Sequence, residues 1–190
     1  MVYTRNDDKS DTKDSARTPP AIFKLLDDRF HFNIDLAASI ENALCNRFHF
    51  VSETNPLGFL NPEIHLTEKD IAFCNHPYAP GMTPAFQKKF WEETRDTNCT
   101  IVNLCIADVS TKSFAEFVMG YDLKKGCFKD HAASEVIFFT PRINYLNADG
   151  SPQDSPQFGS MAVVWKKETF DGSPVMSLLQ HHCNIRKTKN

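Results

Sequence analysis

Four near-continuous apolar runs constrain the fold of this chain more than any other feature of its sequence. The runs are 70–74, 100–107, 135–139 and 160–165. They lack the alternation of polar and apolar residues that marks a sheet with one wet face, so they are typical of strands buried on both faces. Strands that alternate with helical segments indicate an α/β fold, with a mostly parallel sheet and helices on both faces.

Segments with helical spacing of apolar residues lie among these runs. The spacing predicts one helix that ends near Arg29 and a second that begins at Thr83-Pro84 and ends at about Arg95. Shorter helices are expected at 40–46 and 113–119.

Two further strands are expected, at 31–39 and 47–51. The segment 147–158 is rich in Gly, Pro, Asp and Ser and lies between two apolar runs. This composition is typical of a surface loop, and the arrangement resembles a hairpin. The final strand is therefore expected to be antiparallel to an otherwise parallel sheet.

The chain of 190 residues is long enough for one domain with a substantial core. We expect a polar N-terminal tail over 1–16, the domain over 17–168, and a weakly structured basic tail over 169–190. The formal charge of −3 does not suggest a protein that coats nucleic acid, although a local basic groove remains compatible with it.

Six cysteines are present, without a C-x-x-C pair or zinc-type spacing. The sequence shows no signal peptide and no apolar run long enough to cross a membrane. A reducing cytoplasmic setting without a disulfide framework, a membrane or a metal is the simplest interpretation. His181-His182-Cys183 is the one tempting metal cluster, but adjacent ligands in a polar tail are more often solvated.

The run 70–74 leads directly into a polar tetrad, Asn75-His76-Pro77-Tyr78. In an open α/β sheet, ligands bind just beyond the carboxyl ends of the strands. An amide, a proline-restricted turn and an aromatic ring at that edge suit a planar ring that carries an amine. A plain turn at the end of a strand is the alternative.

An earlier strand ends in a comparable position, at Asp35-Leu36-Ala37-Ala38-Ser39. An acidic residue followed by small residues lets the backbone approach a ligand closely. The alternative is an ordinary strand followed by a helix cap at Ser39.

Three segments in this order resemble the phage-type DNA N6-adenine methyltransferases, a Dam-like family. They are Arg17-Thr18-Pro19 with Phe32–Ala43, then Phe73–Tyr78, then Arg142–Leu146 with Phe158–Trp165. Together they cover roughly residues 15 to 166, and their order and spacing make the match specific. The resemblance implies a Rossmann-like methyltransferase fold that uses S-adenosyl-L-methionine and acts on adenine in double-stranded DNA.

The resemblance also implies roles for residues at matching positions. The tetrad Asn75-His76-Pro77-Tyr78 would be the catalytic motif. The implied cofactor-binding residues are Thr18, Pro19, Asp35, Leu36, Ala37, Ala38 and Asn75, with Glu53 as the candidate for the ribose hydroxyls. Candidates for DNA contact are Thr111, Lys112, Arg142 and Asn144, with an ordinary helix cap as the alternative at Thr111.

The chemistry at the tetrad has a physical reason of its own. The lone pair of adenine N6 is delocalised into the ring, so the amine is a poor nucleophile. The side-chain oxygen of Asn75 and the backbone carbonyl of residue 76 can each accept one N6 hydrogen, which moves the nitrogen toward a nucleophilic geometry. The base must leave the duplex to reach such a site, and Tyr78 offers a ring on which it can stack.

His76 departs from the family, which has proline at this position. The carbonyl survives the change, but the fixed φ of the first proline is lost. A neutral His76 could add a donor, and a charged one near pH 6.5 would repel the sulfonium. We therefore expect reduced or pH-shifted activity, and we expect His76→Pro to raise turnover.

Two other functions remain open. The altered tetrad favours a protein of this fold that binds DNA or a partner without catalysis. An N4-cytosine methyltransferase shares the amine-activating chemistry, but it typically has Ser at the first tetrad position, so Asn75 favours adenine.

Overall fold

The computed structural model describes residues 16–49, 55, 57–153, 156, 158–167 and 174–181. These residues form a seven-stranded sheet in the order β2-β1-β3-β4-β8-β7-β9 and a separate two-stranded hairpin, β5-β6. The strands of the sheet are β1 (Ile34–Asp35), β2 (Arg47–Phe48), β3 (Ile71–Cys74), β4 (Thr100–Ile106), β7 (Glu135–Thr140), β8 (Ser160–Lys166) and β9 (Val175–Gln180). The hairpin strands are β5 (Tyr121–Asp122) and β6 (Cys127–Phe128).

Six strands of the sheet run in one direction and β8 runs against them. The pairs β1-β2, β1-β3, β3-β4 and β7-β9 are parallel, whereas β8 pairs antiparallel with both β4 and β7. The predicted antiparallel strand is confirmed as β8. It is not the final strand, because β9 follows it.

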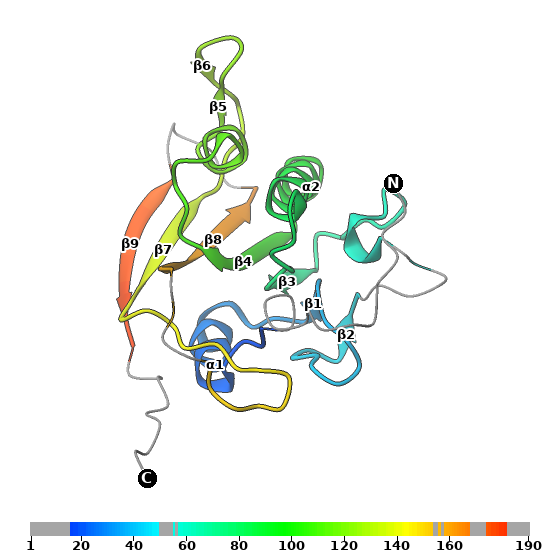
Figure 1. The fold of residues 1–190 in the computed structure, drawn as a ribbon. Coiled ribbons are helices and arrows are strands. Elements are labelled where there is room, and N and C mark those ends of the chain that lie inside the picture. Colours follow the sequence, from blue (N-terminus) through cyan, green and yellow to red (C-terminus); the bar gives the residue numbers. More distant parts are fainter. Residues whose placement is uncertain are drawn as a thin grey trace.

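Helices cover both faces of the sheet, as predicted (Figure 1). They are α1 (Pro20–Phe30), α2 (Met82–Asp96), the 3₁₀ turn η1 (Gly58–Leu60) and the π-helical turn η2 (Phe114–Val118). In Figure 1, α1 lies on one side of the sheet and α2 on the other. The described part of the chain therefore has the layered α/β architecture that the sequence predicts.

Strand β4 shows why polar and apolar residues do not alternate along the central strands. Val102 and Leu104 belong to the core cluster that contains Ile22 and Leu26 of α1. Ile101 and Cys105 belong to the cluster that contains Phe86 and Phe90 of α2. Both faces of the strand are dry, so apolar residues follow one another without interruption.

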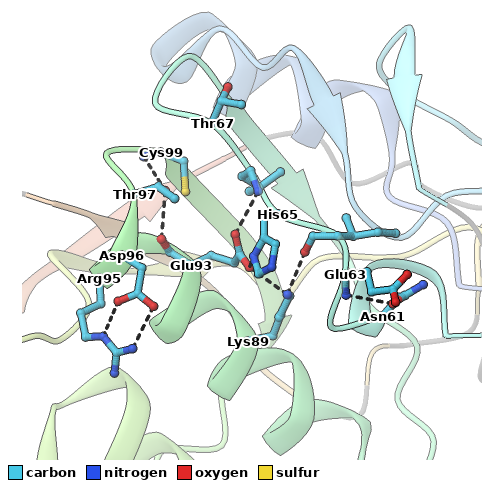
Figure 2. Close-up of polar contacts among 12 residues, drawn as sticks. Asn61, Glu63, His65, Thr67, Lys89, Glu93, Arg95, Asp96, Thr97 and Cys99 are labelled. Carbon is cyan, nitrogen blue, oxygen red and sulfur yellow. Dashed lines mark hydrogen bonds and ion pairs between the residues drawn. The ribbon is translucent and has the colours of Figure 1, made fainter.

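The segment 61–69, which precedes β3, is held to α2 by a buried carboxylate and by Lys89, whose Nζ donates to the carbonyl oxygen of Ile64 at 2.8 Å (Figure 2). Glu93 is 4 % exposed, and its Oε1 lies 2.9 Å from His65 Nδ1 and 2.8 Å from Lys89 Nζ. Its Oε2 accepts a hydrogen bond of 2.9 Å from the backbone N–H of Leu66. This network anchors the approach to β3, whose carboxyl end carries the tetrad.

The expected helix at 40–46 is wrong, because the segment consists of turns. A side chain takes a backbone donor that the helix would use, because Asp35 Oδ2 accepts from the N–H of Leu44 at 3.3 Å. Asn42 Oδ1 accepts from the N–H of Ser39, just before the segment. Short polar side chains that bond to nearby backbone compete with helix formation in this way.

The sequence also predicted no strand in two places where the structure has one. The hairpin β5-β6 lies between η2 and β7, and it projects from the body of the molecule (Figure 1). Strand β9 lies within 169–190, so the expected weakly structured tail is wrong for Val175–Gln180. The expected N-terminal tail, apart from Ala16, lies outside the described residues.

Candidate functional site

A cavity lies at the carboxyl ends of β1 and β3, where the sequence placed the site. Its volume is about 320 Å³. Its walls are Ala16, Arg17, Thr18, Pro20, Asp35, Ala37, Glu41, Asn42, Ala43, Leu44, Phe73, Asn75, Pro77, Leu146 and Gly150. This volume lies at the lower end of the range of small-molecule sites, about 300–1,000 Å³.

Asp35 supplies a desolvated carboxyl group to this cavity. The residue is 4 % exposed, and its oxygens accept hydrogen bonds from the N–H groups of Ala37 at 3.2 Å and Leu44 at 3.3 Å. Burial raises the pKa of Asp35 to about 6, and these two donors lower it by less. A buried carboxylate with so little compensation favours a cationic ligand.

The side-chain amide of Asn75 has a defined direction. Its Nδ2 donates to Thr18 Oγ1 at 3.1 Å and to the carbonyl oxygen of Ala16 at 3.4 Å. Its Oδ1 accepts from the Tyr78 hydroxyl at 3.1 Å. An amide oxygen has two lone pairs, so Oδ1 can accept a second hydrogen bond.

Tyr78 is half-buried, and its hydroxyl lies between Asn75 and the sheet. The hydroxyl is also 3.4 Å from the carbonyl oxygen of Leu104. Burial raises the pKa of Tyr78 well above its ordinary value, and the neighbouring Tyr145 raises it further. Burial also raises the pKa of Tyr145 to about 12, and the Tyr145 hydroxyl donates to Ser160 Oγ at 3.3 Å. Both phenols are therefore protonated donors at neutral pH.

The side chain of His76, the second residue of the tetrad, is a buried and neutral ring. It is 1 % exposed, and its ring centroid lies 5.1 Å from that of Phe86 and 5.2 Å from that of Tyr78. Burial lowers the pKa of His76 to about 4, and the backbone of His76 and Pro77 opposes this by less. Neither ring nitrogen has a hydrogen-bond partner among the described residues. The imidazole thus packs as an apolar side chain would, without charge at pH 6–8.

A second cavity of about 400 Å³ has Tyr78 in its wall. Tyr78, Gln87 of α2 and the segment that follows β4 contribute to its walls, including the predicted residues Thr111 and Lys112. Thr111 Oγ1 accepts from the N–H of Phe114 at 3.2 Å, which is the helix cap considered as the alternative. The tetrad therefore contributes to both cavities, with Asn75 and Pro77 in the wall of the first and Tyr78 in the wall of the second.

The structure brings most, but not all, of the predicted residues to these cavities. Thr18, Asp35, Ala37 and Asn75 line the first, whereas Pro19, Leu36 and Ala38 do not. Leu36 is 1 % exposed and belongs to the core. Glu53 lies outside the described residues.

Two of the predicted DNA contacts are not among the residues that line the two cavities. Arg142 and Asn144 line neither of them, and Arg142 Nη1 donates to the carbonyl oxygen of Pro156 at 3.2 Å.

Several residues of the first cavity were missed. Arg17 and Leu146 form an isolated antiparallel bridge, and the segment 41–44 folds over the Asp35 carboxylate. Arg17, Leu146 and part of 41–44 lie in the segments that resemble the family. That resemblance was the only feature of the sequence that could have pointed to them. Sequence spacing alone does not show that residues 17 and 146 are neighbours.

A comparison with known protein families shows which family the chain belongs to. A family model described as DNA N-6-adenine-methyltransferase (Dam) matches residues 5–189. The chain belongs to the Dam family. No curated protein matches the chain.

The Dam family match spans nearly the whole chain, including β9. The family name indicates an enzyme that methylates N6 of adenine in DNA, which agrees with Asn75 at the first tetrad position. Among the described residues, no group of three or more His, Cys, Asp or Glu side chains could hold a metal ion. No helix in the described ranges is long and apolar enough to cross a membrane.

Proposed function

We propose that this chain transfers the methyl group of S-adenosyl-L-methionine to N6 of adenine in double-stranded DNA. The observation that carries the proposal is the direction of the Asn75 amide. Its oxygen lies on the side of Tyr78, and its nitrogen is engaged by Thr18 and Ala16. A fixed acceptor in the wall of the first cavity, hydrogen-bonded to a tyrosine in the wall of the second, is suited to the activation of an aromatic amine.

The residues of the first cavity fit the proposed cofactor. S-adenosyl-L-methionine carries an ammonium and a sulfonium, and the desolvated carboxylate of Asp35 favours positive charge. Ala37 leaves room for a ligand close to the backbone, and Thr18 adds a hydroxyl group. When bound, the cofactor supplies an electrophilic methyl group. These residues would hold it, and Glu53 remains a prediction for the ribose.

The tetrad supplies the acceptors for the amine. Asn75 Oδ1 and the carbonyl oxygen of His76 each accept one N6 hydrogen, which localises the nitrogen lone pair. The Tyr78 hydroxyl does not block this, because Oδ1 has a second lone pair. His76 is neutral at the pH of the reaction, so it adds no repulsion toward a sulfonium.

The second cavity offers space for an extruded base beside the ring of Tyr78. Base flipping into a pocket with an aromatic wall is the usual route by which enzymes act on a base in a duplex. Lys112 is exposed beside this cavity and is suited to a phosphate contact. Double-stranded DNA is the proposed partner.

The test is incubation of the protein with tritiated S-adenosyl-L-methionine and unmethylated double-stranded DNA, followed by nucleoside analysis. Label in N6-methyladenine is the expected result, and Asn75→Ala should abolish it. Asn98→Ala, the same change at an exposed position between α2 and β4, is the control and should retain activity. Label in N4-methylcytosine would contradict the adenine assignment. Unlabelled DNA, together with bound cofactor, would favour the alternative in which the altered tetrad binds without catalysis.

A further inference from the structure

Asn75 receives its orientation from a segment that lies nearly sixty residues earlier in the chain. Thr18 Oγ1 is 3.1 Å and the Ala16 carbonyl oxygen 3.4 Å from Nδ2. The carbonyl oxygen can only accept a hydrogen bond, whereas a hydroxyl group can donate or accept. Ala16 therefore determines that the nitrogen end of the amide faces this segment, and Thr18 provides the shorter of the two bonds.

The opposite orientation would be unfavourable for a specific reason. It would place Oδ1 against the Ala16 carbonyl oxygen, where two acceptors repel each other. It would also direct Nδ2 toward the Tyr78 hydroxyl, which would remove the acceptor from the side on which the amine is proposed to bind. The segment 16–18 thus selects which end of the amide is available for chemistry.

The segment is itself held in place. The N–H of Arg17 donates to the carbonyl oxygen of Leu146 at 2.8 Å, and the N–H of Leu146 donates back to that of Arg17 at 2.9 Å. Thr18 is 7 % exposed. Tyr145, which directly precedes Leu146, is a neighbour of the Tyr78 hydroxyl. The segment 145–146 therefore contacts the chain on both sides of Asn75, at Arg17 next to Thr18 and at Tyr78.

We propose that Thr18 is a positioning residue for methyl transfer, in addition to any contact with the cofactor. Its hydroxyl group holds the Asn75 amide so that Oδ1 is presented to the amine. This inference rests on the proposed function. It assigns Thr18 an effect on the chemical step that a cofactor contact alone would not have.

The first test compares Thr18→Val, which keeps the shape but removes the acceptor, with Thr18→Ser, which keeps the hydroxyl group. Thr18→Val should lower kcat on unmethylated DNA about tenfold, the loss expected for one hydrogen bond. Thr18→Ser should restore kcat to within about twofold of the wild type, since its acceptor is retained. The dissociation constant of S-adenosyl-L-methionine should change much less than kcat. Thr100→Val, the same change at the amino end of β4, is the control.

The second test observes the amide directly and does not depend on activity. The side-chain NH₂ signals of Asn75, identified by their absence in Asn75→Ala, should exchange slowly in ¹⁵N-labelled wild type and Thr18→Ser. They should exchange faster in Thr18→Val.

Three results would overturn the inference: an unchanged kcat in Thr18→Val, a change in cofactor affinity alone, or equal amide exchange in all three proteins. A wild type that leaves DNA unlabelled would overturn the proposed function and, with it, the role of Thr18 in methyl transfer. The amide exchange would then still decide whether Thr18 holds Asn75.

Discussion

At the scale of single residues, the site depends on groups whose charge and direction are set by burial. Asp35 has its pKa raised, His76 has its pKa lowered, and the Asn75 amide is bonded at both ends. The identities of these residues were visible in the sequence. Their protonation states were not, because desolvation depends on what the rest of the chain packs around each group.

Asp35 should make cofactor binding depend on pH. A cationic ligand binds the ionised carboxylate, and Asp35 becomes protonated as the pH falls through about 6. The affinity for S-adenosyl-L-methionine should therefore be constant above pH 7 and about tenfold weaker at pH 5. Isothermal titration calorimetry between pH 5 and 8 measures this. Asp35→Asn should bind weakly with a flat profile, and an equally steep profile in that variant would assign the effect to another group.

The same raised pKa has a consequence for stability, with the opposite sign from a salt-bridged carboxylate. The folded state binds the Asp35 proton more tightly than the unfolded state, so this group makes the protein less stable as the pH rises from about 4 to about 6. The melting temperature of the ligand-free protein should consequently fall between pH 4 and pH 7 by more in the wild type than in Asp35→Asn, whose side chain does not titrate. The same pH dependence in both proteins would contradict the desolvation of this carboxylate.

His76→Pro should raise kcat, because a second proline restores a fixed φ to the turn that presents the carbonyl of residue 76. The neutral imidazole adds a condition to this prediction: the pH profile of turnover between 6 and 8 should not change. Steady-state kinetics on unmethylated DNA over that pH range provides the test. If turnover falls, His76 contributes to the reaction in a way that its packing against Phe86 and Tyr78 does not explain.

At the scale of elements, local patterns predicted those structures whose interactions are local or buried on all sides. Helices α1 and α2 follow from the spacing of their apolar residues, and β3, β4, β7 and β8 from their apolar runs. The predictions were wrong at 40–46, at β5-β6 and at β9. In each of these segments, a partner elsewhere in the chain or a side chain that bonds to the backbone determines the conformation.

The hairpin β5-β6 illustrates the limit. Each strand has two residues, which is too short for a periodic pattern. The turn signal is nevertheless present: Asp122 Oδ1 accepts from the N–H groups of Lys124 and Lys125, and Gly126 has a φ of 69°. Aspartate followed by a glycine with positive φ is typical of a tight hairpin connection.

The Glu93 network makes a prediction at this scale. Glu93→Ala leaves the N–H of Leu66 without its buried acceptor and Lys89 without its charged partner, so we expect a loss of about 3 kcal/mol in the free energy of unfolding. Glu92→Ala is the matched control, since Glu92 pairs with Lys88 on the surface at 3.6 Å and should cost less than about 0.5 kcal/mol. Urea denaturation measures both. Equal losses would mean that the network does not hold 61–69 to α2.

At the scale of the whole molecule, strand β9 extends the sheet at the edge far from the cavities. It pairs with β7 along its whole length, from Glu135 opposite Val175 to Thr140 opposite Gln180. Leu179 packs against the cluster on the α1 face, and His181 is 3 % exposed. This strand belongs to the domain, although its sequence predicted a tail.

Truncation after Lys167 tests the contribution of β9. Without it, β7 becomes an exposed edge rich in apolar residues, so the melting temperature should fall and the protein should tend to aggregate. The truncated protein that stays in solution should retain its affinity for the cofactor, because the first cavity lies at β1 and β3, near the opposite edge of the sheet. Differential scanning fluorimetry and light scattering measure these properties. A truncated protein as stable and monomeric as the full chain would show that 168–190 is dispensable.

The sequence by itself determined the central strands, the two long helices and the position of the polar tetrad directly after β3. Each of these depends on a pattern within a few neighbouring residues. Only the tertiary structure decided that 16–18, 75–78 and 145–146 meet, which end of the Asn75 amide faces Tyr78, and that the Asp35 carboxyl is desolvated. Those properties depend on chain segments that approach each other through the sheet, and no local pattern encodes the distance between them.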